Sequence, residues 1–206
     1  MATAARLPAP RRRERILQAA IAAFARRGYE GTSVGEIAAA AGITKPVLYD
    51  HFPSKRALFV EAIEGIRDEL LARGAEVMGH ADPLEVRFRD AVEAFFAYVE
   101  ERPDAARVLL VTPQGEPELA AASRRVQAEA TQGLTALLAG EPALLPGVRD
   151  RRRRLELVTE FLKQGMHGLA EWWTEHPSTP RRGLVEAVVA VAWTGLSRSS
   201  RPSRAG

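Results

Sequence analysis

The chain has 206 residues, which suffices for one domain or for a small head joined to a larger body. Its net charge is +3 and it has no cysteine, which excludes disulfides, thiolate zinc sites and cysteine nucleophiles. The N-terminal residues lack the apolar core of a secretory signal, and the longest uncharged apolar run, Ala187–Trp193, is too short to span a bilayer. We expect no membrane partner, and an intracellular location is compatible with the absence of cysteine.

The charge is unevenly distributed along the chain. Residues 1–56 contain ten basic and four acidic side chains, whereas the remainder contains nineteen basic and twenty-two acidic ones. A basic excess is ordinarily a solvated surface. Here it coincides with a helix-turn-helix pattern, so the two signals together indicate a surface that meets phosphate.

The chain opens with residues 1–10, which are rich in Ala and Pro and are predicted to form a disordered arm. A first helix follows from about Arg11 to Arg27, with an apolar face at Ile16, Leu17, Ala20, Ile21 and Phe24. Arg11, Arg12 and Arg13 lie at its start. They could follow the DNA backbone or a minor groove as an arm, or remain solvated, and the sequence leaves both open.

The stretch Thr32–Arg56 reads as two short helices joined by a tight turn. Ser33 with Glu36 has the capping-box spacing, Gly42 suits the turn, and Thr44 caps the second helix. Leu48 and Phe52 give that helix an inner face. Its outer face carries Lys45, Pro46, Val47, Tyr49 and His51. This is the organisation of a helix-turn-helix, whose second helix enters the major groove of DNA.

The remaining chain shows helical periodicity and no strand pattern. Ser54 is expected to cap a long helix to about Gly79, and Asp82 to cap the next with Pro83 in its first turn. Further helices are predicted over 104–111, 117–138 and 151–176, and from Pro180 on. The predicted fold is all-α, with a three-helix helix-turn-helix head over 11–56 and a C-terminal helical bundle over 57–198. Residues 199–206 are predicted to be a disordered tail.

The last two helices have apolar residues at alternating steps of three and four, as in a dimer seam. Two such helices from each of two subunits would form a four-helix bundle. The predicted interface residues are Leu155, Val158, Leu162, Leu169, Leu184, Val188, Ala192 and Trp193.

The segment GYEGTSVGEIAAAAGITKPVLYDHFPSKRALF, Gly28–Phe59, resembles the TetR family of bacterial transcriptional regulators. The resemblance implies a repressor that binds a pseudo-palindromic operator as a homodimer and is released by a small-molecule effector of unknown identity, with no cofactor. It also implies a protein of the bacterial cytoplasm that joins the nucleoid when bound to double-stranded DNA. Gly35 departs from the family pattern, because this position often carries a larger polar residue.

Positions within the motif predict the DNA contacts. Lys45, Pro46 and Val47 are candidates for base edges, since lysine donates to guanine and apolar groups contact the thymine methyl. The candidates for phosphate contact are Thr32, Ser33, Thr44, Tyr49, His51 and Lys55, with Tyr49 able to reach either backbone or base. Lys55 opposes the dipole of its own helix, which favours an anionic partner.

A ligand site in the C-terminal helices would be lined by aromatic and sulfur-containing side chains, although such stripes are more often core. The candidates are Phe88, Phe95, Phe96, Met166, Trp172 and Trp173. His167, Glu171 and Glu175 have a spacing that could hold a metal, but surface polarity explains them better, so no metal is predicted. The basic run Arg151–Arg154 could be solvated, paired with acids or placed at a pocket mouth.

Two other functions remain open. The same head could serve an activator or a regulator without a ligand. An enzyme built of helices is disfavoured, because no nucleophile–base pattern and no glycine-rich phosphate loop occurs, and no catalytic residue is predicted.

Overall fold

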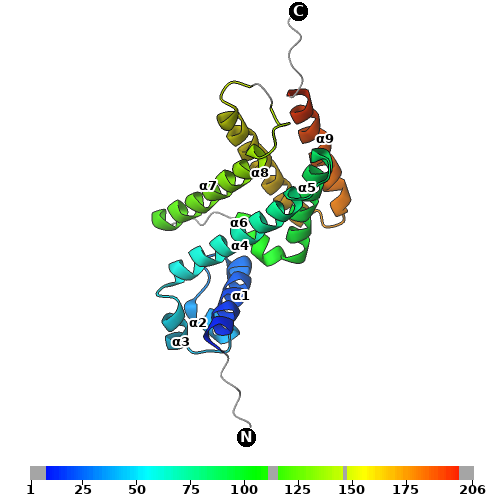
Figure 1. Cartoon of the computed structure of the whole chain (residues 1–206). Helices are drawn as coiled ribbons and strands as arrows, with labels where there is room; N and C mark the ends of the chain where they lie inside the picture. Colours follow the sequence, from blue (N-terminus) through cyan, green and yellow to red (C-terminus); the bar gives the residue numbers. More distant parts are fainter. Residues whose placement is uncertain (1–7, 111–115, 146–147, 200–206) are drawn as a thin grey trace, which may run out of the picture. The chain divides into compact units, whose positions relative to one another are not determined.

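The computed structural model describes residues 8–110, 116–145 and 148–199, and within these ranges it contains nine α-helices and no strand (Figure 1). The predicted all-α fold is confirmed. The helices are α1 (Ala9–Arg27), α2 (Val34–Ala40), α3 (Lys45–His51), α4 (Lys55–Met78), α5 (Leu84–Glu101), α6 (Pro103–Leu110), α7 (Pro117–Ala139), α8 (Arg151–Glu175) and α9 (Arg181–Ser199). The predicted disordered arm and tail fall largely outside the described residues.

The N-terminal ends of α2 and α4 follow the predicted capping, whereas Thr44, the N-cap of α3, makes no side-chain cap hydrogen bond. Ser33 and Glu36 form the full capping box, and the Ser54 hydroxyl accepts from the amide of Ala57 at 3.0 Å. Asp82 was predicted to cap the following helix, which is wrong by one residue, because Pro83 is the N-cap and α5 begins at Leu84. A proline N-cap offers no side-chain acceptor, so this end lacks a side-chain cap. α1 begins at Ala9, two residues earlier than expected.

The chain divides into two compact units. The head unit contains the chain up to Ile66 together with Asp104–Arg124, and the C-terminal unit contains Arg67–Pro103 together with the chain from Arg125 on. α4 and α7 each contribute to both units. The predicted domain division at residues 56 and 57 remains a prediction.

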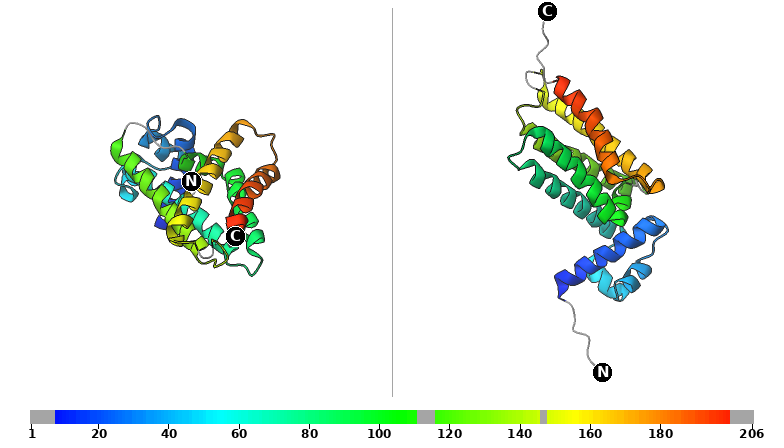
Figure 2. Two further views of the ribbon diagram at one scale, coloured as in Figure 1. Left: turned by 90° about the horizontal axis from the view of Figure 1, so that it is seen from above. Right: turned by 90° about the vertical axis from the view of Figure 1, so that its right-hand side faces the viewer.

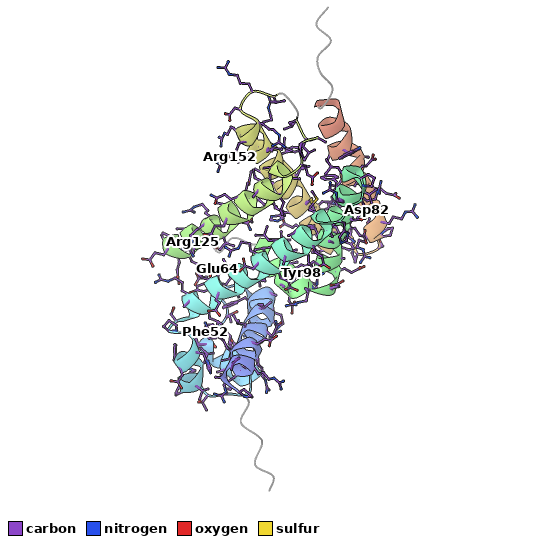
Figure 3. All side chains as sticks on the ribbon, in the orientation of Figure 1. Phe52, Glu64, Asp82, Tyr98, Arg125 and Arg152 are labelled. Atoms are coloured by element: carbon purple, nitrogen blue, oxygen red, sulfur yellow. The ribbon has the colours of Figure 1, made fainter. Side chains whose placement is uncertain are left out.

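The head unit is built on apolar side chains from its first four helices. Ile16, Ile37 and Leu48 are fully buried, as predicted, and Phe52, labelled in Figure 3, is almost fully buried beside them. Three rings, Phe24, Tyr29 and Phe59, lie with centroids 5.2 to 5.8 Å apart. Gly42 has φ +66°, the left-handed conformation that the tight turn between α2 and α3 requires. This core fixes the orientation of α3.

In the C-terminal unit, α5 and α9 lie side by side (Figures 1 and 2). Arg181 at the start of α9 pairs with Glu93 and Glu100 of α5, and Phe88 lies 6.0 Å from Trp193, centroid to centroid. Tyr98 of α5, labelled in Figure 3, is fully buried and donates to Glu69 at 3.2 Å. Burial and the charge of Glu69 raise the pKa of Tyr98. In the part of the chain that the structure describes, no helix is long and apolar enough to cross a bilayer.

Candidate functional site

The helix α3 presents one face to the core and the opposite face to solvent. Leu48 is fully buried, whereas Lys45 and Pro46 are exposed and Tyr49 keeps 49% of its surface accessible. Because Tyr49 and Lys45 are both exposed, neither side chain contributes to the core of the head. This face therefore supplies the polar and aromatic groups that could meet base edges.

The side chain of Lys45 lies across Gly35 of α2. A Cβ atom placed on Gly35 would stand 2.7 Å from Cε of Lys45, closer than any relaxed contact allows. The missing side chain at Gly35 thus leaves room for the lysine stem over the start of α2. A side chain at this position would displace the flexible end of the exposed Lys45 side chain from the place it takes here.

Two predicted phosphate contacts have structural partners within the head. Thr32 is buried, and its hydroxyl donates to the carbonyl of Gly28 at 2.7 Å. The ammonium of Lys55 donates to the carbonyls of Tyr29 and Thr32 at 2.9 and 3.1 Å and stands 4.1 Å from the centroid of the Tyr29 ring. Both side chains therefore clamp the link between α1 and α2. Their contact with phosphate stays a prediction.

The other predicted contacts surround α3. Ser33 and Thr44 are exposed at the N-caps of α2 and α3, and the Thr44 hydroxyl makes no cap hydrogen bond. Val47 and His51 are half-buried. The structure thus brings the predicted residues together at α2, α3 and the start of α4, while their contact with DNA stays a prediction.

Arg13 of α1 has a role that the sequence did not indicate. Its guanidinium donates to the carbonyl of His51 at 2.6 Å, forms an ion pair with Glu61 of α4, and lies 4.2 Å from the centroid of the Phe52 ring. One side chain thereby holds the C-terminal end of α3 against α1 and α4. A carbonyl at a helix C-terminus carries partial negative charge, which a cation stabilises. Arg13 is accordingly a positioning residue for α3 and not part of a free arm.

Replacing Arg13 by alanine should loosen α3 without unfolding the head. Because this side chain is partly exposed, we expect a cost of about 1 kcal/mol for local opening, so that the α3 amides exchange about fivefold faster with deuterium. Hydrogen exchange of the full-length protein measures this. Arg11→Ala, which removes an exposed arginine two residues away, is the control. Equal protection in both variants would contradict the positioning role.

Three of the five predicted ligand-lining aromatics form one connected group in the C-terminal unit, whereas Phe88 and Trp172 have other ring partners. Phe95 and Phe96 of α5 have centroids 5.2 Å apart, and Phe96 meets Trp173 of α8 edge to face at 6.2 Å. Phe88 is buried on the same helix and Met166 is half-buried on α8. Trp172 is exposed and stacks on His176 at 4.0 Å. We call Phe95, Phe96, Trp173 and His167 the aromatic cluster, and its contact with a ligand stays a prediction.

His167 belongs to this cluster and not to a metal site. Its ring stacks on Phe95 at 5.9 Å, and burial followed by the charge of Lys163 lowers the pKa of His167 to about 4, against a smaller opposing effect of Glu160. Glu171 and Glu175 of the same helix are exposed. Over the described residues, no group of three or more His, Asp or Glu side chains is arranged to hold a metal ion.

The depressed pKa of His167 predicts a pH dependence of stability. The unfolded chain takes up a proton on this histidine near pH 6.5 and the folded chain does so near pH 4, so stability falls as the pH drops through this window. We expect a loss of up to about 2 kcal/mol between pH 7.5 and 5. Urea unfolding followed by tryptophan fluorescence measures it. His167→Gln cannot titrate and should lose less, and identical pH profiles would contradict the assignment.

The four arginines of the basic run Arg151–Arg154, at the start of α8, make different contacts. Arg151 donates to the carbonyls of Glu141, Leu144 and Ala139 at 2.6 to 3.2 Å, so it caps the end of α7 and the connection to α8. Arg153 pairs with Glu156 at 2.9 Å, while Arg152 and Arg154 are exposed. This run is therefore partly a structural clamp.

The predicted dimer residues on α8 and α9 differ in burial, and their role in a subunit contact stays a prediction. Leu155, Leu184 and Ala192 are buried within the chain, and Val158, Leu162, Leu169, Val188 and Trp193 are half-buried. Other large apolar side chains are exposed, namely Leu157, Phe161 and Trp172 along one stripe of α8, and Val191 on α9. Gly165 and Gly168 continue this stripe between Phe161 and Trp172. We call these six residues the exposed apolar face.

The chain is similar in sequence to known bacterial transcriptional regulators. Residues 16–62 match the family described as "Bacterial regulatory proteins, tetR family". The chain is 30% identical over 193 residues to the HTH-type transcriptional activator FasR of Mycolicibacterium smegmatis, covering 93% of this chain and 86% of FasR. It is 29% identical over 192 residues to the HTH-type transcriptional repressor KstR2 of Rhodococcus jostii, covering 90% of this chain and 91% of KstR2.

A solved structure shares the fold over most of the chain. The transcriptional regulator FadR from Bacillus subtilis, determined in complex with stearoyl-CoA, superimposes with a TM-score of 0.76 at 16% identity. The match covers 88% of this chain and 98% of that protein. The superposition shows that this chain and FadR share a fold over the C-terminal helices as well as the head.

Proposed function

This chain belongs to the TetR family of bacterial regulatory proteins and is a DNA-binding transcriptional regulator, and we propose that it is a repressor that acts as a homodimer. The observation that carries the proposal is the exposed face of α3 with Lys45 and Tyr49, held in place by Arg13. Two such helices would read two half-sites of a pseudo-palindromic operator.

The exposed apolar face on α8 and α9 supports a homodimer. Phe161 exposes 71% and Val191 72% of their surfaces, and a grouping of exposed large apolar side chains is the kind of surface at which proteins associate. Glycines at 165 and 168 would allow the backbones of two helices to approach closely. A twofold axis through this face would make it self-complementary, as isologous dimers require.

We further propose that a small molecule bound within the C-terminal unit releases the protein from DNA. The aromatic cluster offers an apolar surface between α5 and α8, and the related fold of FadR was solved with stearoyl-CoA. Because α4 contributes to both units, a ligand that favours one arrangement of α4 would change the spacing of the two α3 helices in the dimer.

The test combines occupancy with transcription. Chromatin immunoprecipitation identifies the promoters that the protein occupies, and deletion of its gene should raise transcription from them. Stearoyl-CoA should then release the purified protein from the same promoter DNA in a gel shift.

A second function is favoured by the relative FasR, which is named an activator. In that case the same promoters are occupied, but deletion of the gene lowers their transcription. Unchanged transcription at every occupied promoter would contradict both proposals.

A further inference from the structure

The C-terminal unit contains polar side chains where apolar ones would be expected. Thr131 and Thr135 lie one turn apart on α7, and Thr159 and Lys163 lie one turn apart on α8. All four are more than nine-tenths buried. Burial of polar groups is unfavourable unless they are hydrogen-bonded, so each of them needs a partner.

The polar groups of Lys163 and Thr131 are hydrogen-bonded. The ammonium of Lys163 donates to the Thr131 hydroxyl at 2.7 Å and to the carbonyl of Gln127 at 3.0 Å, and it stands 3.0 Å from a carboxylate oxygen of Glu160. The Thr131 hydroxyl donates to the same carboxylate at 2.5 Å. All three ammonium hydrogens therefore have acceptors.

The charges of this group also balance. Burial raises the pKa of Glu160, but hydrogen bonds from Thr131, Gln164 and Lys163 outweigh it and lower the pKa to about 2, so the carboxylate is ionised. His167, one turn beyond Lys163, is neutral at physiological pH because its pKa is near 4. One ammonium and one carboxylate thus cancel, and no spare positive charge remains for an anion.

The hydroxyls of Thr135 and Thr159 have no hydrogen-bond partner among the described residues. A buried threonine in a helix commonly donates to the carbonyl four residues earlier. These two do not, although both lie one turn, about 6 Å, from the Lys163–Thr131 contact on the side of the connection between α7 and α8. Two facing helices therefore each offer a free hydroxyl at the same level.

We propose that Thr135 and Thr159 bind the neutral carbonyl of an acyl ligand, such as a thioester or ester with a long apolar chain. A carbonyl oxygen accepts two hydrogen bonds, which matches two hydroxyl donors. The balanced charge beside them disfavours a free carboxylate, since an anion would enter a buried site without a counter-ion. This inference rests on the proposed effector-responsive function and names the chemistry of the effector's head.

Valine substitutions test the two hydroxyls, because valine has the shape of threonine without its polar atom. In the ligand-free protein, Thr135→Val and Thr159→Val should keep or raise the melting temperature, since each removes an unpartnered polar group. The matched control Thr131→Val should lower it, because Lys163 and Glu160 each lose a partner. A lower melting temperature in the two test variants would mean that the hydroxyls serve the fold, and would overturn the proposal.

Calorimetric titration with stearoyl-CoA measures the ligand side. The double variant Thr135→Val/Thr159→Val should bind at least about tenfold more weakly than the wild type, as expected for two lost hydrogen bonds. S-octadecyl-CoA, a thioether without the carbonyl, should bind wild type and double variant equally. Stearate should bind the wild type more weakly than stearoyl-CoA. Equal or tighter binding of stearate would overturn the neutral-carbonyl assignment.

The outcomes separate this inference from the proposed function. If stearoyl-CoA binds the wild type and releases it from DNA, but binds the double variant equally well, the carbonyl site is wrong and the effector-responsive function stands. If stearoyl-CoA and stearate both fail to bind the wild type, the acyl class is overturned together with the proposed effector. DNA binding in the same preparation then still identifies the regulator.

Discussion

Alanine at Lys45 or at Tyr49 should lower the affinity for the operator by about 10- to 100-fold, the usual cost of removing a base-reading side chain. Both side chains lie on the solvent face of α3, so their truncation removes little core packing. The variants should therefore remain folded dimers. A gel shift with operator DNA measures the loss, and Arg154→Ala, which removes an exposed cation in the C-terminal unit, is the control for charge alone.

The salt dependence of Lys45→Ala separates the two ways in which a lysine meets DNA. A lysine that contacts phosphate releases a counterion, so its loss flattens the dependence of log K on log salt by about one. A lysine that donates to a base edge leaves that slope nearly unchanged and weakens discrimination between operator variants. Unchanged affinity in both Lys45→Ala and Tyr49→Ala would contradict the assignment of α3 as the DNA-reading helix.

Glutamate at Phe161 should convert the protein into a monomer and abolish measurable operator binding. Phe161 is the most exposed aromatic side chain on α8, so the substitution costs little within the chain. In a dimer it would bury two unpaired carboxylates at the centre of the contact, each of which costs several kcal/mol. Light scattering coupled to size exclusion should give the mass of one chain at micromolar concentration, and the gel shift should weaken by at least about 100-fold.

The control for this substitution is Ala136→Glu, which introduces the same charge at an exposed small residue of α7. It should leave both the mass and the operator affinity unchanged. A Phe161→Glu protein that still elutes as a dimer would place the subunit contact elsewhere. The half-buried residues Val158, Leu162 and Val188 of the seam predicted from sequence would then be the next to test.

The local features of the head were predictable from the sequence because they depend on near neighbours. The Ser33–Glu36 capping box needs a spacing of three, and the left-handed Gly42 needs only the turn itself. The burial of Leu48 and Phe52 follows from a spacing of four on one helix. Each of these signals is complete within a few residues, so one sequence carries it.

The long-range contacts of Arg13 and Lys55 within the head could not be predicted in this way. Arg13 reaches His51 and Glu61, which lie 38 and 48 residues away, and Lys55 reaches Tyr29 across 26 residues. A basic side chain near a DNA-binding motif suggests phosphate contact, whereas the structure gives both cations carbonyl acceptors within the head. Only the packing of α1 and α4 around the motif brings these groups together.

In the C-terminal unit, the sequence does not show which apolar side chains of α8 are buried within the chain. Helical periodicity finds two apolar faces on α8, but it does not tell which face is covered by the same chain and which by a partner. Leu155 and Phe161 both fit an apolar stripe, yet one is fully buried and the other is 71% exposed. The sequence does show polar residues four apart at Thr131 and Thr135, and again at Thr159 and Lys163. Periodicity alone does not tell that these polar positions face the interior of the unit.

Two copies of α3 in one dimer are proposed to read two halves of one operator. In vitro selection of random DNA duplexes by the purified wild-type protein tests this proposal directly. We expect it to enrich an inverted repeat whose half-site centres lie about 10 base pairs, or a multiple of this spacing, apart. Selection that enriches no sequence, or a single unrepeated half-site, would contradict it.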